Sequence, residues 1–276
     1  MYLKSVVLLL TAFFFITMMT NAADYPATQS VTNVTFTSHV NFTLPMPVQD
    51  VYVILNDSTP DLVYRATPEQ AKDPKILAKE AYTTTNHTPQ DPYMKTKNPV
   101  GPFPRGANLG FTLADWLASV GWGAYIEKDK NGTMDFSFHR LVPNGTYTVW
   151  WAGVTPAPDY RYMVAPVGAS DGSENVFKAD AAGNGTFHAE MKYLLPHSTN
   201  ENRTLIVVRY QSDGKEPGPK PGDYGKIAHV QLLYRLPLPK TMAVPVNQST
   251  AKQPGFEGIF ALIGLLAAAL IAFKKR

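Results

Sequence analysis

The chain of 276 residues contains no cysteine. Disulfide bonds, cysteine nucleophiles and thiolate metal sites are therefore excluded, and an apolar core has to hold the fold together. The sequence also has no His-Glu-x-x-His zinc motif. No glycine-rich loop ends in Gly-Lys-Ser/Thr, which argues against a phosphate-loop nucleotide site. We therefore predict no catalytic residue, no metal site and no cofactor, and we do not expect an enzyme.

An excess of one charge is also missing from the body of the chain. The whole sequence has 25 Lys and Arg against 22 Asp and Glu. The excess lies at the ends, in Lys4 and in the terminal Lys274, Lys275 and Arg276. Without these four, and without Glu257 in the same tail, basic and acidic residues are equal in number. A neutral body implies no basic patch, so we predict that nucleic acid is not a partner.

Long apolar runs occur only at the two ends of the chain. The first begins at Val6, follows the single early cation Lys4, and leads to small residues at Ala22 and Ala23. A charged start, an apolar run and small residues at a cleavage site are typical of a secretory signal peptide. We predict such a signal over residues 1–23, which places the rest of the chain outside the cell. An uncleaved N-terminal anchor is the alternative.

The second run extends from Ile259 to Phe273 and stops at the basic cluster Lys274–Arg276. It covers about 15 residues, whereas a helix needs roughly 20 to cross a bilayer. The basic end favours a C-terminus on the cytoplasmic side. A short transmembrane helix, a buried core helix and a processing signal are all compatible with this pattern.

Three residues ahead of this run favour the processing signal. Pro254, Gly255 and Phe256, followed by the apolar run and the basic end, resemble the PGF-CTERM sorting signal of archaeal surface proteins. Glu257 departs from the apolar pattern, at the membrane edge. The resemblance implies cleavage by an archaeosortase-type enzyme, attachment of a prenyl-type lipid, and an exported protein anchored to the membrane by its C-terminus. The logic parallels that of a removable anchor signal with an apolar tail. A permanent span is the alternative.

Acceptor sequences for N-linked glycans are dense in the predicted exported segment. Each Asn-x-Ser/Thr pattern marks a candidate glycan on a surface loop. Asn-Gly-Thr is also ordinary turn chemistry, and both interpretations can hold at one position. The nine candidate asparagines are Asn33, Asn41, Asn56, Asn86, Asn131, Asn144, Asn184, Asn202 and Asn247.

The pattern of the middle region is typical of β structure. In "GTMDFSFHRLV" the residues Met134, Phe136 and Phe138 alternate with polar ones, which predicts a strand with one buried face. Similar strands separated by Gly, Pro and Asn turns predict an antiparallel β-sandwich with one or two short helices. We expect these helices over Pro74–Tyr82 and, with Thr112 and Asp115 as a capping box, over Leu113–Val120.

The expected fold class is thus mainly β, with a signal peptide in front and an apolar helix behind. Residues 83–110 are expected to form a Pro-rich loop, because they show no period. The expected segments are a signal peptide at 1–23, an N-terminal β segment with a short helix and that loop at 24–105, a β-sandwich domain at 106–236, a linker at 237–254 and the sorting-signal or transmembrane segment at 255–276.

Three groups of residues are the candidates for chemistry or recognition. His139, His188 and His229 are expected on polar strand faces and would bind a metal only if their strands were adjacent. Oxygen ligands gather between Asp171 and Asn184, although their spacing does not fit a calcium loop. The Gly/Pro-rich segment 213–225 is either a recognition surface or a plain strand connection.

We therefore favour a cell-surface glycoprotein with a structural or ligand-binding β-sandwich. Its expected partners are the membrane and the processing enzyme, with surface-layer proteins or polysaccharide as further candidates. The alternatives are a permanently spanning adhesion or assembly subunit, and an exported enzyme or metal-binding domain that acts on an extracellular polymer.

Overall fold

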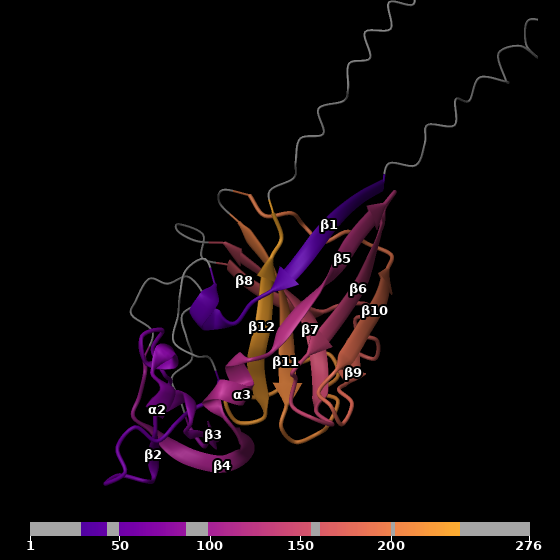
Figure 1. Ribbon diagram of the computed structural model, residues 1–276. Coiled ribbons are helices and arrows are strands. Elements are labelled where there is room, and N and C mark those ends of the chain that lie inside the picture. The colour runs from indigo at the N-terminus through magenta and orange to yellow at the C-terminus, as the bar shows by residue number, and fades with distance from the viewer. Residues whose placement is uncertain (1–28, 43–49, 87–98, 156–160, 200–201, 238–276) are drawn as a thin grey trace, which may run out of the picture. The chain divides into compact units, whose positions relative to one another are not determined.

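A computed structural model describes residues 29–42, 50–86, 99–155, 161–199 and 202–237 (Figure 1). All of them belong to one of two compact units, Met1–Pro239. The second unit, Lys240–Arg276, lies outside the described residues. The predicted signal peptide, the sorting signal and all of the linker beyond Pro237 are outside them as well.

Two antiparallel sheets form the body of this unit. The first has the order β1-β5-β6-β10, with β1 at Gln29–Phe36, β5 at Val120–Lys128, β6 at Asn131–His139 and β10 at Gly185–Met191. β5 and β6 form a hairpin in which Val120 pairs with His139 and Lys128 with Asn131. β1 pairs with β5 along its whole length, so a strand from the expected 24–105 segment lies in the same sheet as strands from 106–236.

The second sheet has the order β12-β11-β7-β8, and the short β9 pairs with β7. β7 runs over Thr146–Thr155, β8 over Arg161–Pro166 and β9 over Val176–Lys178. β11 runs over Arg203–Gln211 and β12 over Ala228–Arg235. The central strand β11 is bonded on both sides, which suits its nearly continuous apolar run.

The inner faces of the two sheets bury one apolar core, as the alternating pattern predicts. Met134, Phe136 and Phe138 of β6 are at most 3% exposed, and Tyr147 and Val149 of β7 are fully buried. A buried side chain of this size contributes roughly 2 kcal/mol. The predicted mainly β antiparallel sandwich is thus confirmed.

A third, smaller sheet has the order β2-β4-β3 and carries the short helices. A second apolar cluster packs here and joins Ala81 of this sheet with Val53, Leu113 and Trp116. The elements are β2 at Leu62–Val63, β3 at Glu80–Thr84, β4 at Phe103–Thr112, α2 at Pro74–Leu77, α3 at Leu113–Leu117, and the 3₁₀ turns η1 at His39–Asn41 and η2 at Gln70–Lys72.

Both predicted helices exist but are shorter than expected. α2 ends at Leu77, and the following residues form β3 because they pair with β4. α3 ends at Leu117, since Val120 already begins β5 and pairs with β6. The capping box is present: Thr112 Oγ1 accepts from the Asp115 amide at 3.2 Å, and Asp115 Oδ2 accepts from the Thr112 amide at 2.9 Å.

The expectation that all of residues 83–110 form a loop is wrong at both ends, because Thr83 and Thr84 are the last residues of β3. Residues 103–112 form β4, which pairs with β2 and β3. Prolines and glycines conceal this strand in the sequence. Its pairing with β3 is irregular, with register shifts that accommodate those residues.

Candidate functional site

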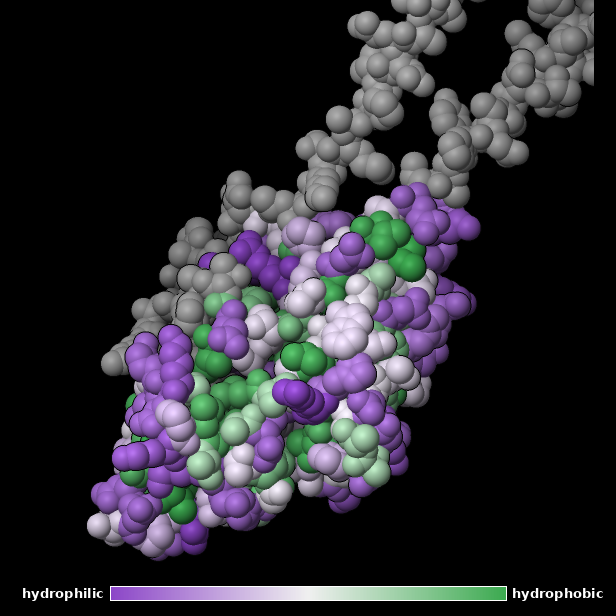
Figure 2. Space-filling view, viewed as in Figure 1, coloured by the Kyte–Doolittle hydropathy of each residue, from purple (hydrophilic) through white to green (hydrophobic). Residues whose placement is uncertain are grey.

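The outer face of the first sheet carries the most exposed large apolar side chains of β1 and β5. Val31 is 56% exposed, Val120 44% and Trp122 47%. Figure 2 shows pale and green residues among purple ones over these strands. The register aligns Thr35 with Trp122, and Trp122 with Ser137 of β6. This face therefore combines an aromatic ring with small hydroxyl side chains.

Trp122 stacks against a histidine of the neighbouring strand. Its ring centroid lies 4.8 Å from that of His139, with an interplanar angle of 13°. His139 Nδ1 in turn lies 2.7 Å from Oδ1 of Asn184, which accepts its proton. The histidine thus holds the indole ring in place and is itself fixed by the asparagine.

A charged pair extends the same face toward β10. His188 Nδ1 lies 2.6 Å from Asp135 Oδ1, and His188 Nε2 lies 3.9 Å from Glu190. The hydrogen bond to Asp135, together with both negative charges, raises the pKa of His188. Because all three side chains are exposed, the pair adds little stability. These side chains place hydrogen-bond donors and acceptors on the same outer face as the indole ring.

Seven candidate glycan acceptors are exposed among the described residues, and Asn184 is half-buried. Asn184 Nδ2 donates to Asp180 Oδ2 at 3.2 Å, while its Oδ1 accepts from His139. Asn247 lies outside the described residues, as do Pro254, Gly255 and Phe256. The exposed acceptors are Asn33, Asn41, Asn56, Asn86, Asn131, Asn144 and Asn202.

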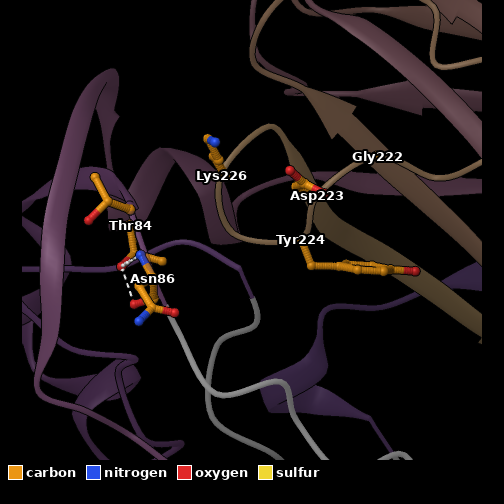
Figure 3. A pocket seen from close by; sticks show the side chains of 7 residues that line it. Thr84, Asn86, Gly222, Asp223, Tyr224 and Lys226 are labelled. Carbon is orange, nitrogen blue, oxygen red and sulfur yellow. Dashed lines mark hydrogen bonds between the residues drawn. The ribbon is translucent and has the colours of Figure 1, made fainter.

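A polar pocket of about 370 Å³ lies between β3 and the loop before β12 (Figure 3). Thr84 and Asn86 line one side, and Asp223 and Lys226 line the other, while Tyr224 points away. The Thr84 amide donates to the Gly225 carbonyl at 2.9 Å, which ties the sheet to the loop. The predicted segment 213–225 therefore connects neighbouring strands β11 and β12 and also forms one wall of a pocket.

Tyr224 instead covers a buried arginine. The guanidinium carbon of Arg209 lies 4.9 Å from the ring centroids of both Trp150 and Tyr224. Arg209 is 1% exposed, and this burial lowers its pKa. Its Nε and Nη1 have no hydrogen-bond partner among the described residues. Cation–π contact thus offsets part of the cost of burying this charge.

The three candidate histidines do not come together. His139 and His188 lie on adjacent strands of the first sheet, whereas His229 lies on β12 of the second. His229 was expected on an exposed face but is fully buried. Its Nδ1 donates to the Asp50 carbonyl at 2.5 Å, and its Nε2 accepts from Ser212 Oγ at 2.9 Å. The chain that covers β12 is remote in sequence, so a strand pattern alone does not reveal this burial.

The carboxylates between Asp171 and Asn184 serve local turns. Asp171 Oδ1 accepts from the amide and the hydroxyl of Ser173. Asp180 Oδ1 accepts from the amides of Ala182 and Asn184. These hydrogen bonds lower the pKa of both aspartates. Within the ranges that the structure covers, no three His, Asp or Glu side chains are placed to hold a metal ion.

Trp122 and Arg209 are the two site residues that the sequence analysis did not single out. Trp122 lies between Gly121 and Gly123, directly after the helix that was expected to end at Val120. The alternation of Val120 and Trp122 with two glycines, followed by Tyr125 and Ile126, is the sequence signal that could have identified this strand.

The comparison with known protein families gives one match, at the C-terminus. Residues 253–275 match the PGF-CTERM motif, as the resemblance of Pro254, Gly255 and Phe256 predicts. No curated protein and no solved structure matches the chain. The motif identifies an exported archaeal protein that an archaeosortase processes at its C-terminus and that is anchored at the cell surface. No helix in the described part of the chain is long and apolar enough to cross a membrane.

Proposed function

We propose that this protein is a glycoprotein of the archaeal envelope with a processed, lipid-modified C-terminus and a non-enzymatic β-sandwich that binds ligands or builds structure. The observation that carries the proposal is the PGF-CTERM match at residues 253–275. It follows a sandwich whose last strand, β12, ends at Arg235. The 17 residues 236–252 then separate β12 from the motif, a length that can span a few nanometres when extended.

Two features support the glycoprotein part of the proposal. Seven acceptor asparagines are exposed among the described residues, so a glycan can be added without unfolding the core. They occur in all parts of the fold, from Asn33 on β1 to Asn131 at the β5–β6 hairpin and Asn202 before β11. A surface covered in this way suits a protein that faces the outside of the cell.

The ligand-binding part is supported by the outer face of the first sheet. Trp122 offers an apolar ring, while Asp135 and Glu190 offer carboxylates on the same outer face. Rings flanked by hydrogen-bonding groups suit the apolar faces and hydroxyl edges of a polysaccharide. The alternative, an exported enzyme or metal-binding domain, is less favoured, since His229 lies in the other sheet from His139 and His188.

The proposal is tested with the full chain expressed in an archaeal host that has archaeosortase and N-glycosylation. A triple variant of Pro254, Gly255 and Phe256 to Ala should keep its tail and the residues Lys274–Arg276. A matched control changes Val244, Pro245 and Val246 to Ala and should be processed normally. Membrane fractions are analysed by mass spectrometry for the C-terminus, its lipid and the glycans. Equal processing of both variants, or an unmodified protein in the cytosol, would contradict the proposal.

A further inference from the structure

The register of the first sheet brings a glycan acceptor next to the exposed tryptophan. Asn33 pairs with Ala124, and Thr35 of the same acceptor sequence pairs with Trp122. All four residues lie on the outer face, because Val34, between Asn33 and Thr35, is buried, as are Gly121 and Tyr125, which flank Trp122 and Ala124 in sequence. Diagonal neighbours on one face of a sheet have Cβ atoms about 7 Å apart, within reach of a sugar attached to Asn33.

One face of the indole ring is occupied, and the other lies on the side of Asn33. His139, which stacks on Trp122, pairs with Val120, two residues before the tryptophan and on the β6 side. Asn33 pairs with Ala124, two residues after it and on the β1 side. The two residues therefore lie on opposite sides of Trp122 along one diagonal. A ring stacked on His139 presents its free face toward Asn33.

The surroundings leave room for a glycan at this position. Asn33 is exposed, and its cross-strand neighbour Ala124 has a small side chain. Among the residues that the structure describes, no hydrogen bond engages the side-chain amide of Asn33. The side-chain amide of Asn184, in contrast, makes two. The acceptor nitrogen is thus free to carry a sugar.

We propose that Asn33 carries an N-linked glycan whose first sugars lie across the outer face of the first sheet, against the free face of Trp122. The proposal deepens the proposed function, because it rests on the chain being glycosylated outside the cell. A hexopyranose ring has one face of C–H groups that packs on an aromatic ring, while its hydroxyls reach polar neighbours. The glycan then covers the apolar side chains of Val31 and Trp122, which are otherwise exposed.

The same glycan also shields the exposed edge of strand β1. β1 is the edge of its sheet, and exposed edges are prone to pair with other chains. The Tyr234 hydroxyl donates to the Asn33 backbone carbonyl at 3.1 Å and so satisfies one hydrogen-bonding group of this edge. A bulky sugar on Asn33 prevents a second copy of the chain from pairing with the other backbone groups of β1.

The experiment compares glycosylated wild-type protein with the variants Asn33→Gln and Asn131→Gln, purified from the archaeal host. Asn131 is a matched control, since it is exposed on the same sheet but lies at the hairpin end, away from Trp122. Tryptophan fluorescence is quenched with acrylamide. Of the four tryptophans, only Trp122 is largely exposed, so it dominates the response. We expect stronger quenching for Asn33→Gln and for chemically deglycosylated wild type, and no change for Asn131→Gln.

NMR spectroscopy provides a second readout that does not depend on the folding of the Asn33 variant. Sugar C–H protons on the indole face should be shifted upfield in the wild type and return to ordinary positions in Trp122→Leu. Unchanged shifts in Trp122→Leu, or equal quenching for Asn33→Gln and Asn131→Gln, would overturn the proposal. A bare Asn33 beside occupied acceptors elsewhere overturns this inference alone. If every acceptor is bare, the glycoprotein part of the proposed function fails with it.

Discussion

At the scale of single residues, the hydrogen bonds of each acceptor asparagine distinguish otherwise identical motifs. Asn131, Asn144 and Asn184 all lie in Asn-Gly-Thr. Within the described part of the chain, only Asn184 makes hydrogen bonds through both the oxygen and the nitrogen of its side-chain amide. A glycan on its nitrogen would replace one of the two amide hydrogens, compete with the bond to Asp180 and crowd His139. We predict that Asn184 is the least occupied of the three, as measured by glycopeptide mass spectrometry. Higher occupancy there than at Asn144 would show that these bonds do not persist.

Buried histidines make the stability depend on pH. Burial lowers the pKa of His229 to about 4 and that of His39 to about 3, while both titrate near 6.5 when unfolded. Below that value the unfolded chain binds more protons, so the free energy of unfolding falls as the pH decreases. The loss approaches roughly 1.4 kcal/mol per pH unit for each histidine, whereas above pH 7 neither contributes a slope.

Urea unfolding between about pH 7 and pH 5 measures this dependence. His229→Gln should reduce the slope, whereas His188→Gln should not, because His188 is exposed and its pKa is shifted upward. If wild type and His229→Gln lose stability in parallel, His229 is not held neutral in the fold.

At the scale of elements, α3 depends on its N-terminal cap. It has only five residues, too few to form alone, and Thr112 and Asp115 satisfy its first amides. Thr112→Ala should lower the free energy of unfolding by about 1 kcal/mol. Chemical denaturation measures this loss, and Thr186→Ala, an exposed threonine on β10, serves as the control. Equal stability of the two variants would show that α3 does not need its cap.

The strand β5 depends on a glycine that lets two aromatic rings approach its backbone. A Cβ at Gly121 would collide with the ring of Phe138 and come within 3.2 Å of Phe36. At Gly153 of β7 the nearest atom would be 3.7 Å away. We predict that Gly121→Ala costs about 1–3 kcal/mol, while Gly153→Ala is tolerated. Thermal unfolding of both variants tests this, and similar melting temperatures would contradict the packing described for β5.

The strands whose inner faces alternate could be predicted from the sequence, and those that depend on distant partners could not. Met134, Phe136 and Phe138 show a period of two, and the structure buries all three. β4 lacks such a pattern, because its side chains pack on only part of a small sheet. Its pairing with β3 and β2 defines it instead.

The candidate sites divide in the same way. Acceptor motifs and the PGF-CTERM signal are local patterns, so the sequence shows them directly. The burial of Arg209 between Trp150 and Tyr224 joins three separate stretches of chain. Likewise, the proximity of Asn33 to Trp122 follows from a register over about 90 residues of separation, which only the paired strands reveal.

At the scale of the whole molecule, the chain combines a neutral antiparallel sandwich with a C-terminal sorting motif. Because the excess positive charge belongs to the ends, their removal would leave a body without net charge. We therefore expect such a body to need its C-terminal anchor, rather than electrostatic attraction to lipid, to stay at the membrane.

The central claim is tested most directly by the mass of the mature C-terminal peptide of the protein isolated from archaeal membranes. The account predicts a peptide that ends near Pro254–Phe256, carries the added mass of a lipid, and lacks the run that follows. An intact, unmodified C-terminus that includes Lys274–Arg276 would contradict it.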